Sequence, residues 1–169
     1  ELSDSLSTLV EIVVDILQVN ATPEVVMSDV TCADELPDDT TCDIIEDYDI
    51  LQISGIQIED IDVVNGESFD IELKIFCNHC TFNLESAVNL INCSEEDSDG
   101  NPEAVDCESI TTGDFAILII EDPIDYINNA ISSIYYQPDL NFYGIDTFTV
   151  YVNDLGNIGF GGEKTAEEI

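Results

Sequence analysis

Short segments in which apolar and polar residues alternate recur along the chain, and this period is typical of β-strands with one buried face. The clearest is 68–76, where Phe69, Ile71, Leu73 and Ile75 share one face. Three further segments have the same pattern: 8–19, 49–58 and 146–153. Segment 115–121 is apolar on both faces, which predicts a strand in the middle of a sheet.

One short helix is predicted within 122–134. Asp122 suits the N-cap position and Pro123 the first helical position. A single apolar stripe follows at helical spacing: Ile124, Ile127, Ile131 and Ile134. The strands do not alternate regularly with helices. We therefore expect an all-β fold, an antiparallel β-sandwich with one short helix across one end.

Composition adds a strong charge constraint to this fold. The chain has 169 residues, of which 44% are hydrophobic, so it can bury a core despite its acidity. It has 38 acidic residues but only two basic ones, which gives a formal net charge of −36. A surface this acidic cannot neutralise phosphates, which excludes nucleic acid as a partner. No apolar run reaches the about 20 residues that span a bilayer, so no membrane insertion is expected in this segment.

Six cysteines without the spacing of matched metal-ligand pairs favour an oxidising compartment. We predict three short-range disulfides: Cys32–Cys42, Cys77–Cys80 and Cys93–Cys107. For Cys77 and Cys80 the alternatives are a redox pair or half of a zinc site. Two glycosylation sequons agree with secretion, beginning at Asn20 and Asn92. The predicted location is therefore extracellular or at the cell surface.

The sequence offers little material for catalysis, and no enzyme is predicted. His79 is the one histidine, and it lies between two cysteines. Acidic pairs are so common in this chain that a pair alone does not indicate a glycosidase, and no tryptophan is present to line a sugar cleft.

Three longer motifs carry a resemblance to a family: LQVNATPEV, IIEDYDILQISGIQIEDID and YINNAISSIYYQPDLNFYGIDTFTVYVNDLGNIGFGG. Together they resemble the repeat unit of giant extracellular proteins built from cadherin-like, Ig-like β-sandwich repeats. The resemblance implies that 1–19 is the last strand of a preceding repeat and that 20–169 is one repeat. It also implies that the last strand of this repeat, the hairpin partner of 146–153, lies beyond Ile169. We therefore expect residues 8–19 to pair beside segment 144–153.

The resemblance also suggests a calcium site. Its candidate ligands are carboxylates: Glu46, Asp47, Asp60, Asp62 and Asp154. Asp60 and Asp62 lie on one side of an extended segment, and the family would place them near a linker. The acidic residue usual in that linker is replaced here, since the chain reads Val19-Asn20-Ala21-Thr22-Pro23. The alternative is a solvated acidic face without bound metal.

Two other acidic features favour structural roles. Segment 95–101 (EEDSDGN) lacks the downstream ligand of an EF-hand and is predicted to be a solvated loop within an insertion, 93–107. Asp146 is expected to bond the backbone of its own turn, as Asp does at strand starts.

These observations lead to a functional hypothesis: a structural module of a secreted fibrous or cell-surface filament protein, such as an adhesin stalk or a flagellar hair. Its expected partners are neighbouring repeats or copies of the same protein, with glycans attached. A calcium-dependent cell-adhesion module, with Ca²⁺ as cofactor, is the alternative. A third hypothesis is a domain adapted to high salt.

Overall fold

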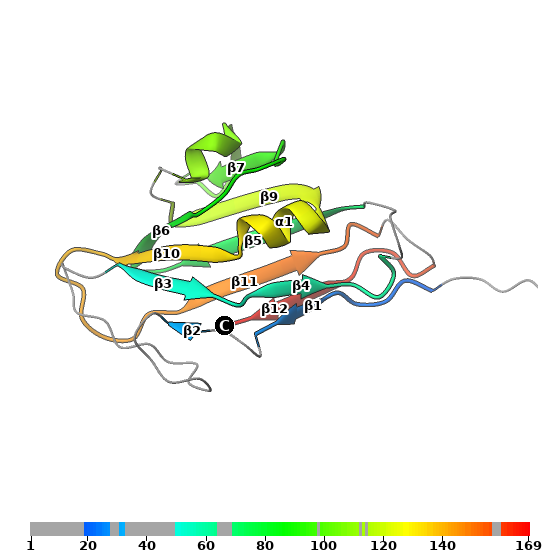
Figure 1. Ribbon diagram of the computed structural model, residues 1–169, viewed down its shortest axis with the longest axis horizontal. Coiled ribbons are helices and arrows are strands. Elements are labelled where there is room, and N and C mark those ends of the chain that lie inside the picture. The colour runs from blue at the N-terminus through cyan, green and yellow to red at the C-terminus, as the bar shows by residue number, and fades with distance from the viewer. Residues whose placement is uncertain are drawn as a thin grey trace, which may run out of the picture.

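The computed structural model describes residues 19–27, 31–32, 50–63, 69–97, 99–111, 113, 115–156 and 160–169. Two β-sheets face each other, and one short helix lies beside them (Figure 1). The strand pairs are antiparallel, so the predicted all-β sandwich with one short helix is confirmed. The cadherin-like identity of this sandwich and the division at residue 19 stay predictions.

The larger sheet has six strands in the order β12-β11-β5-β9-β7-β8. Their bounds are β12 Thr165–Glu168, β11 Phe148–Asn153, β5 Asp70–Cys77, β9 Ile117–Pro123, β7 Cys93–Glu96 and β8 Pro102–Val105. As segment 115–121 predicted, β9 is an interior strand, because β5 and β7 pair with it on its two sides.

The facing sheet has the order β2-β3-β10-β6, and a third, two-stranded sheet joins β1 to β4. The bounds are β2 Thr31–Cys32, β3 Leu51–Ser54, β10 Ser133–Pro138, β6 Cys80–Leu84, β1 Glu24–Val26 and β4 Gln57–Glu59. A 3₁₀ helix, η1, spans Cys107–Thr111, and α1 spans Ile124–Ala130.

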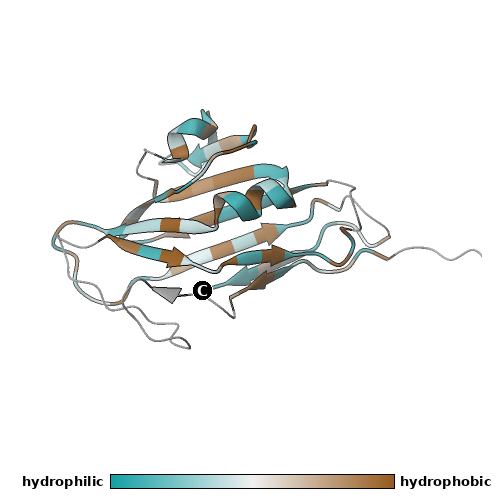
Figure 2. Cartoon of the chain, in the orientation of Figure 1, coloured by the Kyte–Doolittle hydropathy of each residue, from teal (hydrophilic) through white to brown (hydrophobic). Residues whose placement is uncertain are grey.

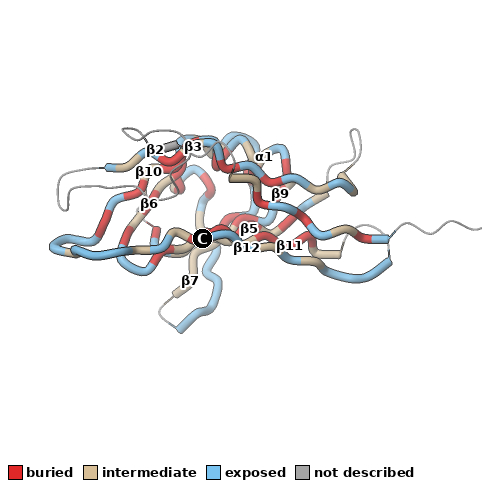
Figure 3. Tube along the Cα trace, turned by 90° about the horizontal axis from the view of Figure 1, so that it is seen from below, coloured by how far each residue is buried: buried red, intermediate tan, exposed pale blue. Residues whose placement is uncertain are grey.

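The core lies between the two sheets, as the buried residues in Figure 3 show. Leu73 of β5 is paired with Ile120 of β9 on one side and Val152 of β11 on the other, and all three side chains are fully buried. The alternation along these strands, visible in Figure 2, therefore places one apolar row of each strand in the core.

Segment 49–58 forms two strands, because Gly55 interrupts it with a positive φ of 91°. Before Gly55, β3 pairs with β10; after it, β4 pairs with β1. Glycine reaches this left-handed region without a steric cost, so the chain can pass from one sheet to another here.

A short helix is confirmed, but its predicted C-terminal end and N-cap are wrong. The helix ends at Ala130, and Ile134 of the predicted apolar stripe lies in β10. Pro123 occupies the N-cap position, and Asp122 is the penultimate residue of β9. The buried Asp122 Oδ2 instead accepts hydrogen bonds of 2.9 Å from the backbone N–H groups of Ile91 and Asn92. Tertiary contacts thus engage this carboxylate in place of the helix end. The helix is tied to β4 by the Asn128 side chain, which bonds both the N–H and the carbonyl of Ile58.

The hairpin partner of β11 lies within the chain, which corrects the prediction that it lies beyond Ile169. β12 pairs with β11 from Val150 to Asn153, and β5 pairs with the opposite edge of β11. Since both edges of β11 are occupied over these residues, the predicted pairing of 8–19 beside it is wrong there. Residues 8–18 lie outside the described residues, and Val19 forms an isolated parallel bridge with Phe160.

The predicted insertion 93–107 extends the large sheet as the β7–β8 hairpin. Glu95 and Glu96 belong to β7, so the solvated loop predicted for 95–101 is shorter than expected. Asp97 closes the turn, because its Oδ1 accepts the N–H groups of Asp99 and Asn101. The Asn101 hydrogen bond is the main cause that lowers the pKa of Asp97.

Two of the three predicted disulfides are confirmed: Cys77–Cys80 and Cys93–Cys107. The first closes the β5–β6 turn, and the second joins the start of β7 to the start of η1. The third predicted pair includes Cys42, which lies outside the described residues.

We predict that Asp122→Ala lowers the free energy of unfolding by about 2–3 kcal/mol, because two N–H groups lose their buried acceptor. Asp122→Asn keeps an acceptor oxygen and should cost less than half as much. Denaturant unfolding followed by circular dichroism measures both. The exposed Asp125→Ala in the first turn of α1 is the control, and a loss there equal to that of Asp122→Ala would contradict the assignment.

Candidate carboxylate site at the linker

Three of the five predicted calcium ligands come together beside the chain that leads into β1. We call the group formed by Asn20, Ala21, Asp60, Asp62 and Asp154 the linker site. It lies at the end of the sandwich where β4 ends and β11 passes into its loop. The backbone N–H of Asn20 donates to the Phe160 carbonyl at 2.9 Å, which holds the linker against the β11–β12 loop.

Asp154 is the central residue of the linker site, and it is only 4% exposed. Its Oδ1 accepts the N–H groups of Gly156 and Lys164, both at 2.8 Å. Its Oδ2 accepts a 2.7 Å hydrogen bond from Asn20 Nδ2, which also donates to the Gly162 carbonyl. These donors compensate the cost of burying the charge. Asp154 therefore bonds its own turn and also fixes the linker.

The turn after Asp154 depends on backbone conformations that few residues adopt. Leu155 has φ 56° and Gly156 has φ 65°. A side chain at position 156 would begin 2.9 Å from the Glu163 nitrogen, so only glycine fits this close approach. The Asn153 side chain stabilises the Leu155 conformation by accepting its N–H at 2.9 Å.

Asp60 and Asp62 form the other half of the linker site. Asp62 Oδ2 accepts the N–H of Ala21 at 2.5 Å, and Asp60 Oδ1 accepts the N–H of Asp62 at 2.8 Å. Burial raises the pKa of Asp60, and repulsion from the Asp62 and Asp154 carboxylates raises it further. The linker is therefore held by carboxylates from two distant parts of the chain.

The hydrogen bonds of the linker site use oxygens that a calcium ion would need. Within the described part of the chain, the linker carboxylates form no group of three whose ligand atoms lie within 4.8 Å of one another. Glu46 and Asp47 lie outside the described residues. A calcium ion takes six to eight oxygens, so in this conformation it would have to displace these hydrogen bonds, and the calcium site stays a prediction.

Among the described residues, one group of three potential metal ligands has its ligand atoms within 4.8 Å of one another. It consists of Cys77, Cys80 and Asp146. Both sulfurs are joined in a disulfide, so they are not the thiolates that a metal would bind. In this oxidised state the two sulfurs do not fit the zinc alternative, whereas the redox-pair alternative, whose oxidised form is also a disulfide, stays a prediction.

Asp146 bonds a different turn from the one expected. Its carboxylate accepts the N–H groups of Asn78 and His79 in the β5–β6 turn, at 3.3 and 3.1 Å, and the Tyr136 hydroxyl at 2.9 Å. The prediction that Asp146 bonds its own turn is corrected, because these partners lie across the end of the sandwich. Burial is the main cause that raises the pKa of Tyr136, and the Asp146 hydrogen bond adds to it. The His79 ring stacks on Phe142 with centroids 4.2 Å apart.

Sequence reasoning missed the structural role of Asn20, which was singled out only as a sequon and as a departure from the family linker. Its position just before Pro23, where the chain enters β1, was the one available signal. The role of Asp122 had no signal, because its hydrogen-bond partners lie about thirty residues away in sequence.

No family model matches the chain, and no match was found among curated proteins or solved structures. Among the described residues, no helix is long and apolar enough to cross a membrane.

We predict that Asp60→Asn raises the melting temperature at about pH 7 by about 1–2 °C. The folded-state pKa of Asp60 lies above its unfolded value, so the stability that the protonated group contributes is fully present below the unfolded pKa and is lost as pH rises through the folded pKa. Below that pKa, at about pH 3, the gain should vanish. Asparagine keeps the oxygen that accepts the Asp62 N–H.

Thermal unfolding at the two pH values measures this difference. Glu103→Gln, which removes one exposed carboxylate from β8, gives the general effect of lowering the net charge. An equal gain in both variants at about pH 7 would refute a specific role of the linker site.

Proposed function

We propose that this chain is a structural module of a secreted fibrous or cell-surface filament protein, and that modules meet end to end. The observation that carries the proposal is the distribution of exposed apolar side chains. Six of them occur in two groups at the opposite ends of the β-strands. The two disulfides and the sandwich fold support an extracellular role.

The first group, which we call the loop tip, belongs to the β10–β11 connection. Its members are Leu140, Tyr143 and Ile145, which are 77%, 86% and 93% exposed. The connection leads into Phe148, whose β5 partner is Cys77 at the end of that strand. The loop tip therefore lies at the end of the sandwich that holds the β5–β6 turn, on the left of Figure 1.

The second group, the linker tip, surrounds the linker site. Its members are Val19, Ile61 and Phe160, which are 69%, 81% and 64% exposed. It lies beyond Asn153, the last residue of β11, whose β5 partner is Glu72 near the start of that strand. Since β5 and β11 run through the sheet between the two groups, the tips are separated by the length of a strand.

The charge of the chain favours contact through the tips over contact through the flanks. The described residues contain both lysines of the chain, Lys74 and Lys164, and Lys74 is already paired with Glu96. Flank-to-flank contact would bring carboxylates together without counterions. Backbone N–H groups near each tip donate hydrogen bonds to Asp146 and Asp154, so the tips lose little freedom on contact.

The free energies of apolar burial and of association indicate whether the modules assemble freely or within one chain. Burying three large apolar side chains is worth about 5–9 kcal/mol, whereas free association costs about 4–15 kcal/mol. Free modules should therefore associate weakly. The same contact becomes effective when modules follow one another in one chain, because tethering supplies a high local concentration.

A calcium-dependent adhesion module is the second candidate. The raised pKa of Asp60 favours it, because burial and two neighbouring carboxylates disfavour its charge, and a cation would relieve both. The linker carboxylates would have to exchange backbone hydrogen bonds for metal contacts.

The end-to-end proposal predicts weak self-association that strengthens with salt, because salt screens the net charge of −36. The double variant Tyr143→Ser, Ile145→Ser should weaken it by at least about tenfold. Sedimentation velocity at about millimolar concentration measures the effect. Val88→Ser is the matched control, since Val88 is 66% exposed but belongs to neither tip. Equal loss in control and variant, or no association at any salt, would contradict the proposal.

The effect of calcium on melting temperature and self-association distinguishes the structural module from the calcium-dependent adhesion module. The structural module should show the same melting temperature and self-association in calcium and in chelator at equal ionic strength. The adhesion module requires a higher melting temperature in calcium, and the stabilisation should grow with the logarithm of one plus the ratio of calcium concentration to Kd. Magnesium at the same concentration is the control for general screening, and a calcium-specific shift lost in Asp60→Asn would favour adhesion.

A further inference from the structure

The two sequons of the chain lie in opposite environments. We propose that only Asn92 carries an N-linked glycan, and that its first sugars cover a hollow on the outer face of the six-stranded sheet. The inference rests on the secretory route that the proposed function implies, but not on the end-to-end contacts.

Asn20 is unsuited to carry a sugar in this fold. The residue is 4% exposed. Its Nδ2 donates both hydrogens, to Asp154 Oδ2 and to the Gly162 carbonyl, each at 2.7 Å. A glycan replaces one of these hydrogens with a bulky ring, so the linker site could not close around it.

Asn92 has the opposite geometry. It is exposed, and it lies just before β7. Its backbone is fixed on both sides, because its N–H donates to Asp122 and its carbonyl accepts the N–H of Glu121. Its side-chain Nδ2 donates one hydrogen to the Glu121 carbonyl at 3.0 Å. The amide has two hydrogens, so one can be replaced while this bond is kept.

Transfer of an oligosaccharide to Asn92 needs one co-reactant, a lipid-linked diphosphate oligosaccharide supplied by the secretory pathway. Asn92 Nδ2 attacks C1 of the first sugar and forms the N–C bond. The C1–O bond to the diphosphate breaks, and the lipid diphosphate leaves with that electron pair. Nδ2 gives up one proton to a base of the transferase. No oxidation or reduction occurs.

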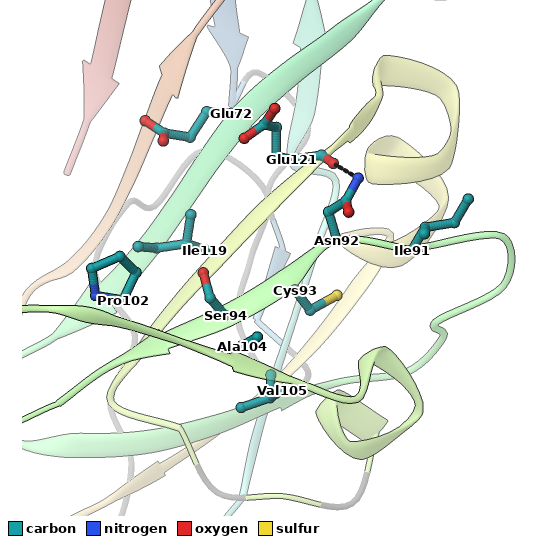
Figure 4. Close-up of a pocket in the computed structure, with 10 residues that line it drawn as sticks. All are labelled: Glu72, Ile91, Asn92, Cys93, Ser94, Pro102, Ala104, Val105, Ile119 and Glu121. Carbon is teal, nitrogen blue, oxygen red and sulfur yellow. Dashed lines mark hydrogen bonds between the residues drawn. The ribbon is translucent and has the colours of Figure 1, made fainter.

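A hollow of about 370 Å³ lies beside Asn92 and is lined from β5, β9, β7 and β8 (Figure 4). Its lining includes the apolar side chains of Ile119 and Ala104 and the carboxylates of Glu72 and Glu121. A hexosamine has the complementary chemistry, since one ring face is apolar and its hydroxyls donate to carboxylates. An oligosaccharide from Asn92 would also hinder pairing to the neighbouring edge strand β8.

Occupancy is tested on the full chain secreted from a eukaryotic host. Intact mass and peptide mapping after enzymatic deglycosylation identify the site, because release converts Asn to Asp and adds about one mass unit. Two variants remove one sequon each without altering either asparagine: Thr22→Ala and Ser94→Ala. We expect one glycan in the parent chain and in Thr22→Ala, and none in Ser94→Ala. A glycan on Asn20, or an unmodified Asn92 in the secreted folded chain, would overturn the assignment.

The hollow is tested by comparing the melting temperatures of the glycosylated chain and the enzymatically deglycosylated chain. We expect removal to lower the melting temperature by about 2–4 °C. Ile119→Ser should reduce this difference, and the same substitution in a Ser94→Ala background controls for its direct effect on folding. A glycan at Asn92 whose removal leaves the melting temperature unchanged would refute contact with the hollow. Neither outcome bears on self-association, so failure here is distinguishable from failure of the end-to-end proposal.

Discussion

The scarcity of cations in this chain decides how its carboxylates are stabilised. Against 38 acidic residues there are two lysines, and one ion pair, Lys74–Glu96, occurs within the described residues. A buried carboxylate without a cation must take its stabilisation from hydrogen-bond donors. Here the backbone supplies most of them: Asp122 and Asp154 are both buried and each accepts two backbone N–H groups.

The same hydrogen bonds organise the loops of the sandwich. Asp122 fixes the chain that enters β7, Asp146 joins the β10–β11 connection to the β5–β6 turn, and Asp154 joins the linker to the β11–β12 loop. Each carboxylate thus ties segments that are far apart in sequence. Acidity therefore contributes to the architecture of the ends, and the apolar rows of the strands account for the core.

The strands that the sequence predicted well are those with at least three apolar residues in one alternating row. β6 was missed although its burial alternates, because its row contains only Phe82 and Leu84 after Cys80. β5 and β11 lie inside the larger sheet, and apolar residues alternate over most of their length. β7, β8 and β12 were missed because their sequences, CSEE, PEAV and TAEE, have no apolar row to detect. These strands lie toward the two edges of the sheet, where pairing to a neighbour is sufficient to order a polar segment.

The three carboxylates of the linker site were predictable from the sequence, but their hydrogen-bond partners were not. The resemblance to extracellular repeats directed attention to Asp60, Asp62 and Asp154, and the fold does gather them at the linker. Their partners could not be read from the sequence, because a hydrogen bond such as Asn20–Asp154 joins residues 134 positions apart. The N-cap rule failed at Asp122 for the same reason, since local preference is worth about 1 kcal/mol and two buried N–H groups outweigh it.

The acidic flanks of the sandwich also limit how modules of this kind could be arranged. Repulsion between acidic flanks acts over about 8 Å at physiological salt, whereas apolar contact acts only at the surfaces that touch. Two modules side by side would feel the repulsion along their whole length, but two modules end to end would feel it only where the tips meet. The linear arrangement has the smaller charged contact and the larger apolar fraction. The flanks carry many carboxylates and one lysine of β5, Lys74, that is already paired, so the proposed linear arrangement has the lower electrostatic cost.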